Sequence, residues 1–323
     1  LIRRLATKFA VRKVISKAAD ILSPHQLGCG VQSGCEAIIH AANLIIQEDP
    51  SLLIMQADLT NAFQNIERDV MLQEVKEQIP EILNICSTCY ETESFLYFGT
   101  HVLKSSRGVG QGCPLSVVIF SLLLMPVILE IQARVPTLRM NSWLMDDSTI
   151  IGKKEELKVA LEVLLEKGPE RGLIVSTDHT VPDNGGKSTV WSPSFNEDTA
   201  ADPLGSGIKR VREDGVVLLG AALGSEEYVR RHLAKLTEKI RDITAQLPRL
   251  QDSMSSLLVL RSCLSLGKFG YTTRTTDLTS HGAALSKFDG IQRDALNTII
   301  GTPLNNQSYQ QSCLPVSLGG LGV

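Results

Sequence analysis

The chain has 323 residues, which is enough for two or three packed units with sizeable cores. Hydrophobic residues make up 43% and charged residues 21% of the chain, and this ordinary globular composition excludes a largely disordered protein. The formal net charge of −3 excludes a uniformly basic nucleic-acid-binding protein, although it is compatible with a local basic face.

Three further features bear on the class of protein. The 7 cysteines are odd in number and irregularly spaced, which favours reduced thiols in an intracellular protein over a disulfide framework. The first residues contain no Met and no signal-peptide pattern, so we expect an N-terminal part of the same polyprotein to be missing. Residues 115–129 are uncharged, but they are shorter than the roughly 18 to 20 apolar residues of a membrane span. They predict a buried helix, and we expect no membrane contact.

The N-terminal part of the chain alternates helical and strand patterns. Apolar residues at helical spacing predict a helix over residues 2–22, with basic residues between them. This basic face is equally typical of a solvated helix surface and of a face that contacts phosphate. The next elements are a helix over 35–47, a buried strand over 52–55 that leads to Asp58, and a helix over 68–78.

The middle of the chain contains two predicted hairpins. Residues 94–104 form the first, and a glycine-rich turn at 108–112 then leads into the apolar helix. A strand reaching Leu144 and a second strand over 148–151 form the other, with Asp146 and Asp147 at its tip. The remaining elements are a helix over 154–171, a loop-like insertion over 182–215, a strand over 216–219 and a mainly helical region over 226–323. A few strands surrounded by helices predict an α+β fold.

The acidic residues at the predicted strand ends suggest metal chemistry. Asp146 and Asp147 are adjacent, and two carboxylates at a strand tip repel each other unless a cation lies between them. Asp58 supplies a third carboxylate if the two strands are neighbours. Such a set suits two Mg²⁺ ions about 4 Å apart. Taken alone, the acidic pair is equally typical of an exposed turn, and Asp58 of a helix cap.

Four segments occur in the order found in reverse transcriptases. Residues 58–66 (DLTNAFQNI) resemble motif A, residues 110–116 (GQGCPLS) motif B, residues 144–147 (LMDD) motif C and residues 172–175 (GLIV) motif D. Two later segments, VLLG at 217–220 and PVSLGGLG at 315–322, resemble segments of retroelement polymerases. The chain thus resembles, over nearly its whole length, the reverse transcriptases of non-LTR (LINE-like) retrotransposons.

This resemblance implies an architecture and an activity. The fold would be a right-hand polymerase palm, an antiparallel sheet with helices, followed by a helical thumb-like region. Residues 1–50 would be partial fingers, residues 51–225 the palm with interleaved finger elements, and residues 226–323 the thumb-like region. The activity would be RNA-directed DNA polymerisation, with an RNA template, a DNA primer and dNTP as partners. The location would be intracellular and nuclear.

The resemblance also implies roles for individual residues. Asp58, Asp146 and Asp147 would hold two Mg²⁺ or Mn²⁺ ions, with Asp147 the least direct ligand. Phe63 would be the steric gate against a ribose 2′-OH, and Lys187 would stabilise charge on the leaving pyrophosphate. The full substrate-binding set would be Asn61, Ala62, Phe63, Gln111, Gly112 and Lys187. Outside these motifs, a core aromatic would be favoured for Phe63, and a solvated surface lysine would be at least as well supported for Lys187. Gln111-Gly112 is also compatible with a simple turn before a helix.

Several departures from the family pattern leave a second hypothesis open. Leu144 stands where the family has an aromatic residue, Gln64 replaces Asp or Asn, and Ser176 replaces Asn in motif D. Lys187 comes late, and the Arg-Pro-Ile segment of the fingers is absent. The alternative is a truncated, catalytically inactive remnant that at most binds nucleic acid. An unrelated metal-dependent phosphotransferase is disfavoured by the order of the motifs.

The basic residues of the C-terminal region also allow two interpretations. Arginines and lysines gather on a predicted helix over residues 226–246, and acidic residues lie among them. This helix would either follow a nucleic-acid backbone or form a salt-bridged protein surface.

Overall fold

The computed structural model describes residues 2–177, 186–205 and 207–323. The chain divides into two compact units, Leu1–Arg212 and Glu213–Val323. The boundary lies before the strands at 215–224, which the resemblance had placed in the region 51–225. The assignment of fingers, palm and thumb to particular ranges stays a prediction.

The first unit is built around a five-stranded sheet in the order β4-β5-β1-β6-β7. All neighbouring strands are antiparallel except β6 and β7, which are parallel. The central strand β1 is apolar and almost completely buried, as expected for a strand covered on both faces. The strands are β1 (Leu53–Gln56), β4 (Met140–Leu144), β5 (Asp147–Gly152), β6 (Thr189–Trp191) and β7 (Lys209–Arg210).

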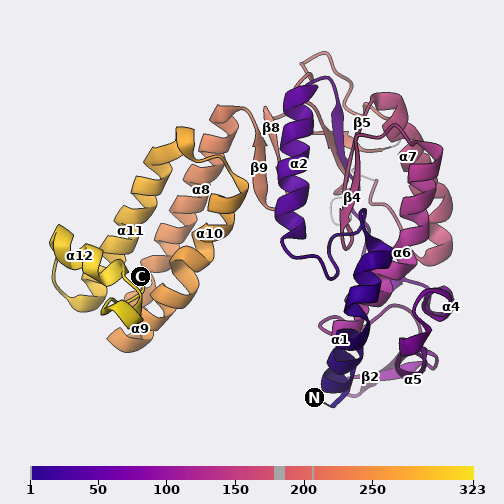
Figure 1. Cartoon of the computed structure of the whole chain (residues 1–323), viewed down its shortest axis with the longest axis horizontal. Helices are drawn as coiled ribbons and strands as arrows, with labels where there is room; N and C mark the ends of the chain where they lie inside the picture. The colour runs from indigo at the N-terminus through magenta and orange to yellow at the C-terminus, as the bar shows by residue number, and fades with distance from the viewer. Residues whose placement is uncertain (1, 178–185, 206) are drawn as a thin grey trace. The chain divides into compact units, whose positions relative to one another are not determined.

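Helices and a separate hairpin complete this unit (Figure 1). The helices are α1 (Ile2–Leu22), α2 (Gly34–Glu48), α3 (Ala62–Asn65), α4 (Arg68–Gln78), α5 (Leu83–Tyr90), α6 (Pro114–Arg134) and α7 (Lys154–Lys167). The hairpin pairs β2 (Ser94–Phe98) with β3 (His101–Ser105) in the predicted place. Together with the sheet, these elements confirm the predicted α+β class.

Helix α6 forms the centre of the core in this unit. It begins with Pro114, whose missing N–H costs nothing in the first turn of a helix. Among the described residues it is the one helix long and apolar enough to cross a membrane, by length and composition alone. However, 72% of its most apolar window is buried within the protein, where it packs against α1, α4 and α7. A core helix therefore accounts for the uncharged run.

Helix α1 is packed less completely than its apolar pattern predicted. Val14, Ala18 and Leu22 are buried in the core, but Leu5 and Phe9 are 60% and 62% exposed. Apolar spacing identifies a helix face, but it carries no information on whether a partner covers that face along its whole length. Lys17 of the basic face forms an ion pair with Glu81 at 2.7 Å.

The prediction of a loop over residues 182–215 was wrong in part, because β6 and β7 lie within it. Val190 and Trp191 of β6 are buried, and Val190 pairs with Met55 of β1. These strands are only three and two residues long, so they lack the alternation that identifies a strand in a sequence. The predicted helix over 154–171 likewise ends earlier, at Lys167, and a 3-10 turn follows at Pro169–Arg171.

The second unit consists of a strand pair followed by helices. Strands β8 (Gly215–Leu218) and β9 (Ala221–Gly224) are joined by Leu219 and Gly220, which both have positive φ, 48° and 86°. Phe269 and Phe288 stack in the core with ring centroids 4.5 Å apart. The helices are α8 (Glu226–Thr244), α9 (Ser253–Val259), α10 (Leu266–Thr275), α11 (Gly282–Ile300) and α12 (Asn306–Cys313).

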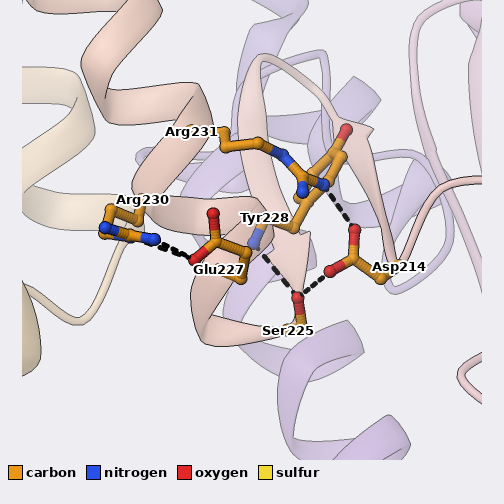
Figure 2. A network of polar contacts seen from close by, with 6 residues as sticks. All are labelled: Asp214, Ser225, Glu227, Tyr228, Arg230 and Arg231. Carbon is orange, nitrogen blue, oxygen red and sulfur yellow. Dashed lines mark hydrogen bonds and ion pairs between the residues drawn. The ribbon is translucent and has the colours of Figure 1, made fainter.

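Two arginines at the start of α8 form ion pairs with acidic residues of the same unit (Figure 2). The Ser225 hydroxyl caps the helix by accepting the Tyr228 N–H at 3.1 Å and donates to Asp214. Arg231 pairs with Asp214 at 2.6 Å, and Arg230 pairs with Glu227. Further along, Arg241 pairs with Glu238. These contacts favour the salt-bridged interpretation of the helix at these arginines.

Candidate active site

The two strands that lead to the predicted acids are direct neighbours. Strand β1 pairs with β5, and the register Met55↔Ile150 continues toward Asp58 at one end of β1 and Asp147 at the start of β5. Asp146 lies in the turn that precedes β5. The sheet therefore brings all three predicted metal ligands to the same end of two adjacent strands.

Buried serines fix the backbone beside Asp58. The Ser148 hydroxyl accepts the Ala57 N–H at 2.6 Å and donates to the Ala57 carbonyl at 3.0 Å, which joins β5 to the end of β1. Ser188 accepts the Asp58 N–H at 3.0 Å, and the Ser176 N–H donates to the Asp58 carbonyl at 2.8 Å. The main chain that carries Asp58 is thus held from both sides.

The electrostatics show that the three carboxylates interact. Partial desolvation raises the pKa of the Asp58 carboxyl; Lys187 opposes this increase, and the negative charge of Asp146 adds to it. The pKa of Asp147 is also raised, first by partial desolvation and then by the charges of Asp146 and Asp58. Asp147 is exposed by surface area, but nearby protein atoms still displace part of the water around its carboxylate. A cation at this place would relieve the mutual repulsion.

The donor atoms fit a hard divalent cation, because Mg²⁺ and Mn²⁺ prefer carboxylate oxygens. Among the described residues, no three His, Cys, Asp or Glu side chains form a preformed metal-binding cluster. The carboxylates are thus electrostatically coupled without enclosing one ligand shell.

The segment after Asp58, which includes the short helix α3, carries three of the predicted substrate-binding residues. Asn61 is exposed and adopts the left-handed conformation with φ 46°, which asparagine tolerates better than most residues. Ala62 is buried, and Phe63 is half-buried. The Phe63 ring stacks on Phe120 of α6 with centroids 4.5 Å apart. Phe63 therefore packs against the core on one side and retains an exposed part.

Gln111 and Gly112 are exposed residues in the glycine-rich turn before α6. The turn begins at Gly108, whose carbonyl accepts the Arg68 Nε–H at 2.8 Å. Arg68 is 8% exposed and also donates to the Ser105 and Arg107 carbonyls at 2.7 and 3.0 Å. One buried guanidinium thus organises the segment that leads into this turn.

Lys187 lies in the electrostatic neighbourhood of Asp58, because its charge lowers the pKa of that carboxyl against the other contributions. Its backbone N–H donates to the Ser176 hydroxyl at 3.1 Å, and its side chain is exposed. The segment before it, residues 178–185, is outside the described residues. Lys187 follows motif D at a greater distance than in the family pattern, but its charge still acts on Asp58.

Ser148, Ser188 and Arg68 support the site, but none of them was predicted from the sequence. All three are buried polar residues whose partners are distant backbone groups. Ser148 directly follows the acidic pair, and this adjacency was the one available signal. Arg68 looked like an ordinary first residue of a helix.

Comparison with known families gives the class of protein, which is that of the reverse transcriptases. Residues 3–181 match the family of reverse transcriptases (RNA-dependent DNA polymerases), and the chain belongs to this family. The resemblance indicated by the four motifs is therefore confirmed. The chain is also 24% identical over 331 residues to the retrotransposable element SLACS 132 kDa protein of Trypanosoma brucei gambiense. This match covers 99% of the chain but 26% of the relative, so the chain spans about a quarter of that protein.

Solved structures similar to the chain include telomerases of two Candida species. Apo telomerase from Candida tropicalis has a TM-score of 0.47 at 10% identity, covering 92% of this chain and 54% of that chain. Telomerase from Candida albicans in complex with a TWJ fragment of telomeric RNA has a TM-score of 0.40 at 12% identity. That match covers 92% of this chain and 51% of the telomerase chain.

Proposed function

We propose that the chain is the RNA-directed DNA polymerase domain of a non-LTR retrotransposon, which transfers a nucleotide from dNTP to a primer 3′-OH. The observation that carries this proposal is the electrostatic coupling of Asp58, Asp146 and Asp147 at the ends of adjacent strands in a chain of the reverse transcriptase family. The similarity to a retrotransposable element protein supports the choice of element. A nuclear location would follow from copying RNA at chromosomal DNA.

The three carboxylates would hold two Mg²⁺ or Mn²⁺ ions. Bound divalent ions lower the pKa of an attacking hydroxyl and neutralise charge on the phosphate. Asp58 and Asp146 would be the more direct ligands, and Asp147 would contribute charge from a more exposed position. Lys187 would face the leaving pyrophosphate, where a positive charge stabilises the developing negative charge.

The remaining predicted residues would bind the substrates. Asn61, Ala62 and neighbouring backbone N–H groups would contact the triphosphate. Gln111 and Gly112 would line the pocket for the incoming nucleotide and the template base, and their exposure leaves them accessible for this role. RNA template and DNA primer would be the macromolecular partners. The names fingers, palm and thumb are proposed for residues 1–50, 51–225 and 226–323 on the same grounds.

The alternative of an inactive remnant predicts the same fold without turnover. The presence of all three acids, together with the serine contacts that fix the backbone beside Asp58, favours an active enzyme. Leu144 in place of an aromatic residue is a feature that favours the alternative. A direct assay of synthesis separates the two hypotheses.

The test is primer extension by the purified chain on an RNA template with dNTP and either Mg²⁺ or Mn²⁺. We expect extension that EDTA abolishes and that an Asp58→Asn chain lacks. The control is the circular dichroism spectrum and thermal melting of Asp58→Asn, which show whether the variant is folded. Absence of extension by the folded parent chain with both metals would contradict the proposal and support the inactive remnant.

Replacing Phe63 by Val tests the proposed steric gate. A smaller side chain removes the clash with a ribose 2′-OH, so we expect ribonucleotide incorporation to rise by about 100-fold relative to deoxynucleotide incorporation. The stability should fall by about 1–3 kcal/mol, because the stacking of Phe63 on Phe120 is lost. Incorporation kinetics with matched dNTP and NTP measure the selectivity. The gate assignment is wrong if the variant loses stability but keeps its sugar selectivity.

A further inference from the structure

The turn that carries the acidic pair is strained at Met145. Leu144 pairs with Asp147, so Met145 and Asp146 form a two-residue connection between β4 and β5. Met145 has φ 59°, in the left-handed region. Hairpin turns with positive φ at their first central position favour glycine, asparagine or aspartate there, because a Cβ atom is disfavoured in this conformation unless a short polar side chain compensates. A methionine stays in this conformation only if surrounding contacts hold it.

Gln26 supplies such contacts through both ends of its side-chain amide. Its Oε1 accepts the Met145 N–H at 2.7 Å, and its Nε2 donates to the Met145 carbonyl at 2.9 Å. The same Oε1 accepts the Gly28 N–H at 3.1 Å. Gln26 is completely buried, at 0% exposure. The amide thus binds both polar backbone groups of the strained residue without competition from water.

The segment around Gln26 is itself fixed to the edge strand β4. The Leu27 N–H donates to the Trp143 carbonyl at 2.8 Å, and the Trp143 N–H donates to the His25 carbonyl at 2.7 Å. Gly28 lies so close to the turn that a Cβ atom there would be 2.6 Å from the Met145 nitrogen. The support is therefore anchored on both sides of Gln26, and the turn has no room to move toward it.

We propose that Gln26 is a positioning residue for the catalytic turn: its amide holds Met145 in the left-handed conformation and thereby orients Asp146 and Asp147. This inference rests on the proposed polymerase function, because it assigns a role in the same site. Gln26 contacts neither substrate nor metal in this role. Removing its hydrogen bonds lets the turn relax, and the two carboxylates then lose their preorganised positions.

The test combines Gln26→Met, which keeps the side-chain volume but removes all three hydrogen bonds, with a matched control. Gln292→Met removes an amide that is also buried, 3% exposed, and bonded to the Leu264 carbonyl in the second unit. We expect Gln26→Met to lower the rate of single-nucleotide incorporation by about 10- to 100-fold, as for small misplacements of catalytic groups. The primer–template dissociation constant should stay the same, and Gln292→Met should leave the rate unchanged.

A rescue variant separates positioning from general destabilisation. Glycine adopts φ near 60° without the Cβ penalty, so Met145→Gly removes the need for an external clamp. In a Met145→Gly background, Gln26→Met should therefore change the rate by less than about threefold. Electron paramagnetic resonance of bound Mn²⁺ gives a readout without turnover: Gln26→Met should weaken Mn²⁺ binding, and Met145→Gly should restore it.

The outcomes separate this inference from the proposed function. An unchanged incorporation rate in folded Gln26→Met, or an equal loss with and without Met145→Gly, would overturn the positioning role. A folded parent chain that does not extend primers with either metal would instead refute the polymerase proposal. In that event, hydrogen exchange at the Met145 amide still tests the clamp: faster exchange in Gln26→Met supports it, and unchanged exchange overturns it.

Discussion

Replacing Asp146 by Asn is expected to reduce the rate of nucleotide incorporation by about 1000-fold, equivalent to about 4 kcal/mol of transition-state stabilisation. Asparagine preserves the size of the side chain but removes the negative charge and one of the two carboxylate oxygens. The position lies in the turn before β5, and its charge acts on both Asp58 and Asp147. Single-turnover incorporation at several Mg²⁺ and Mn²⁺ concentrations measures the effect.

Asp147→Asn is the matched comparison for this prediction. Asp147 is adjacent and also at the turn but is more exposed, so a smaller loss is expected. Neither variant should unfold the protein. The pKa of the Asp147 carboxyl is raised, so its ionised form is disfavoured in the folded state. The resulting loss of stability grows as the pH rises above the unfolded pKa and is complete above the folded pKa. Removing one charge at pH 7 without metal should therefore preserve or raise the melting temperature. Equal rates for Asp146→Asn and the parent chain would contradict the metal-ligand assignment.

The sequence predicted the elements that depend on local pattern. Helix α4 has the same bounds, 68–78, as the periodicity and the following Ile79-Pro80 indicated. The hairpin at Asp146 and Asp147 was also predicted, because two apolar strands flank a short polar connection. The sequence predicted that Asp58 joins Asp146 and Asp147 only on the condition that β1 and β5 are neighbouring strands. Only the strand pairing established it, since pairing depends on contacts that are distant in the chain.

The features that could not be predicted depend on which other segments a residue contacts, and not on the local pattern of apolar residues. Strands β6 and β7 are defined by pairing with β1 and with each other, and they carry too few residues to show a period. The exposure of Leu5 and Phe9 reflects which part of α1 is covered. A periodic apolar face predicts a helix, but its burial depends on the surface that meets it.

The supporting residues of the site were missed for a related reason. Gln26 and Ser148 bond to main-chain atoms of Met145 and Ala57, which are 119 and 91 positions away in the chain. Backbone groups are common to all residues, so no pair of side-chain types marks such a contact in the sequence. The motifs therefore identify the groups that are proposed to act on substrate, whereas the groups that fix their positions require the fold.

Gly172→Ala is expected to destabilise the first unit by about 3–5 kcal/mol, because two separate effects combine. Gly172 has φ +76°, where any other residue is strained by about 1–2 kcal/mol. An added Cβ would also lie 2.0 Å from the Asn65 carbonyl oxygen, a backbone atom at the end of helix α3. The two segments are also joined further along, where the Ser176 N–H donates to the Asp58 carbonyl at 2.8 Å. Denaturant unfolding of the parent and variant chains measures the difference.

Gly112→Ala provides a control that separates the two effects. Gly112 has nearly the same φ, +75°, but an added Cβ meets no atom within 4 Å. Its loss of stability should therefore be limited to the conformational cost of about 1–2 kcal/mol. A similar loss in both variants would show that the contact between Gly172 and Asn65 yields without cost. A clearly larger loss for Gly172→Ala would show that motif D is packed against motif A through a backbone contact that only glycine permits, with Asp58 held in the same segment.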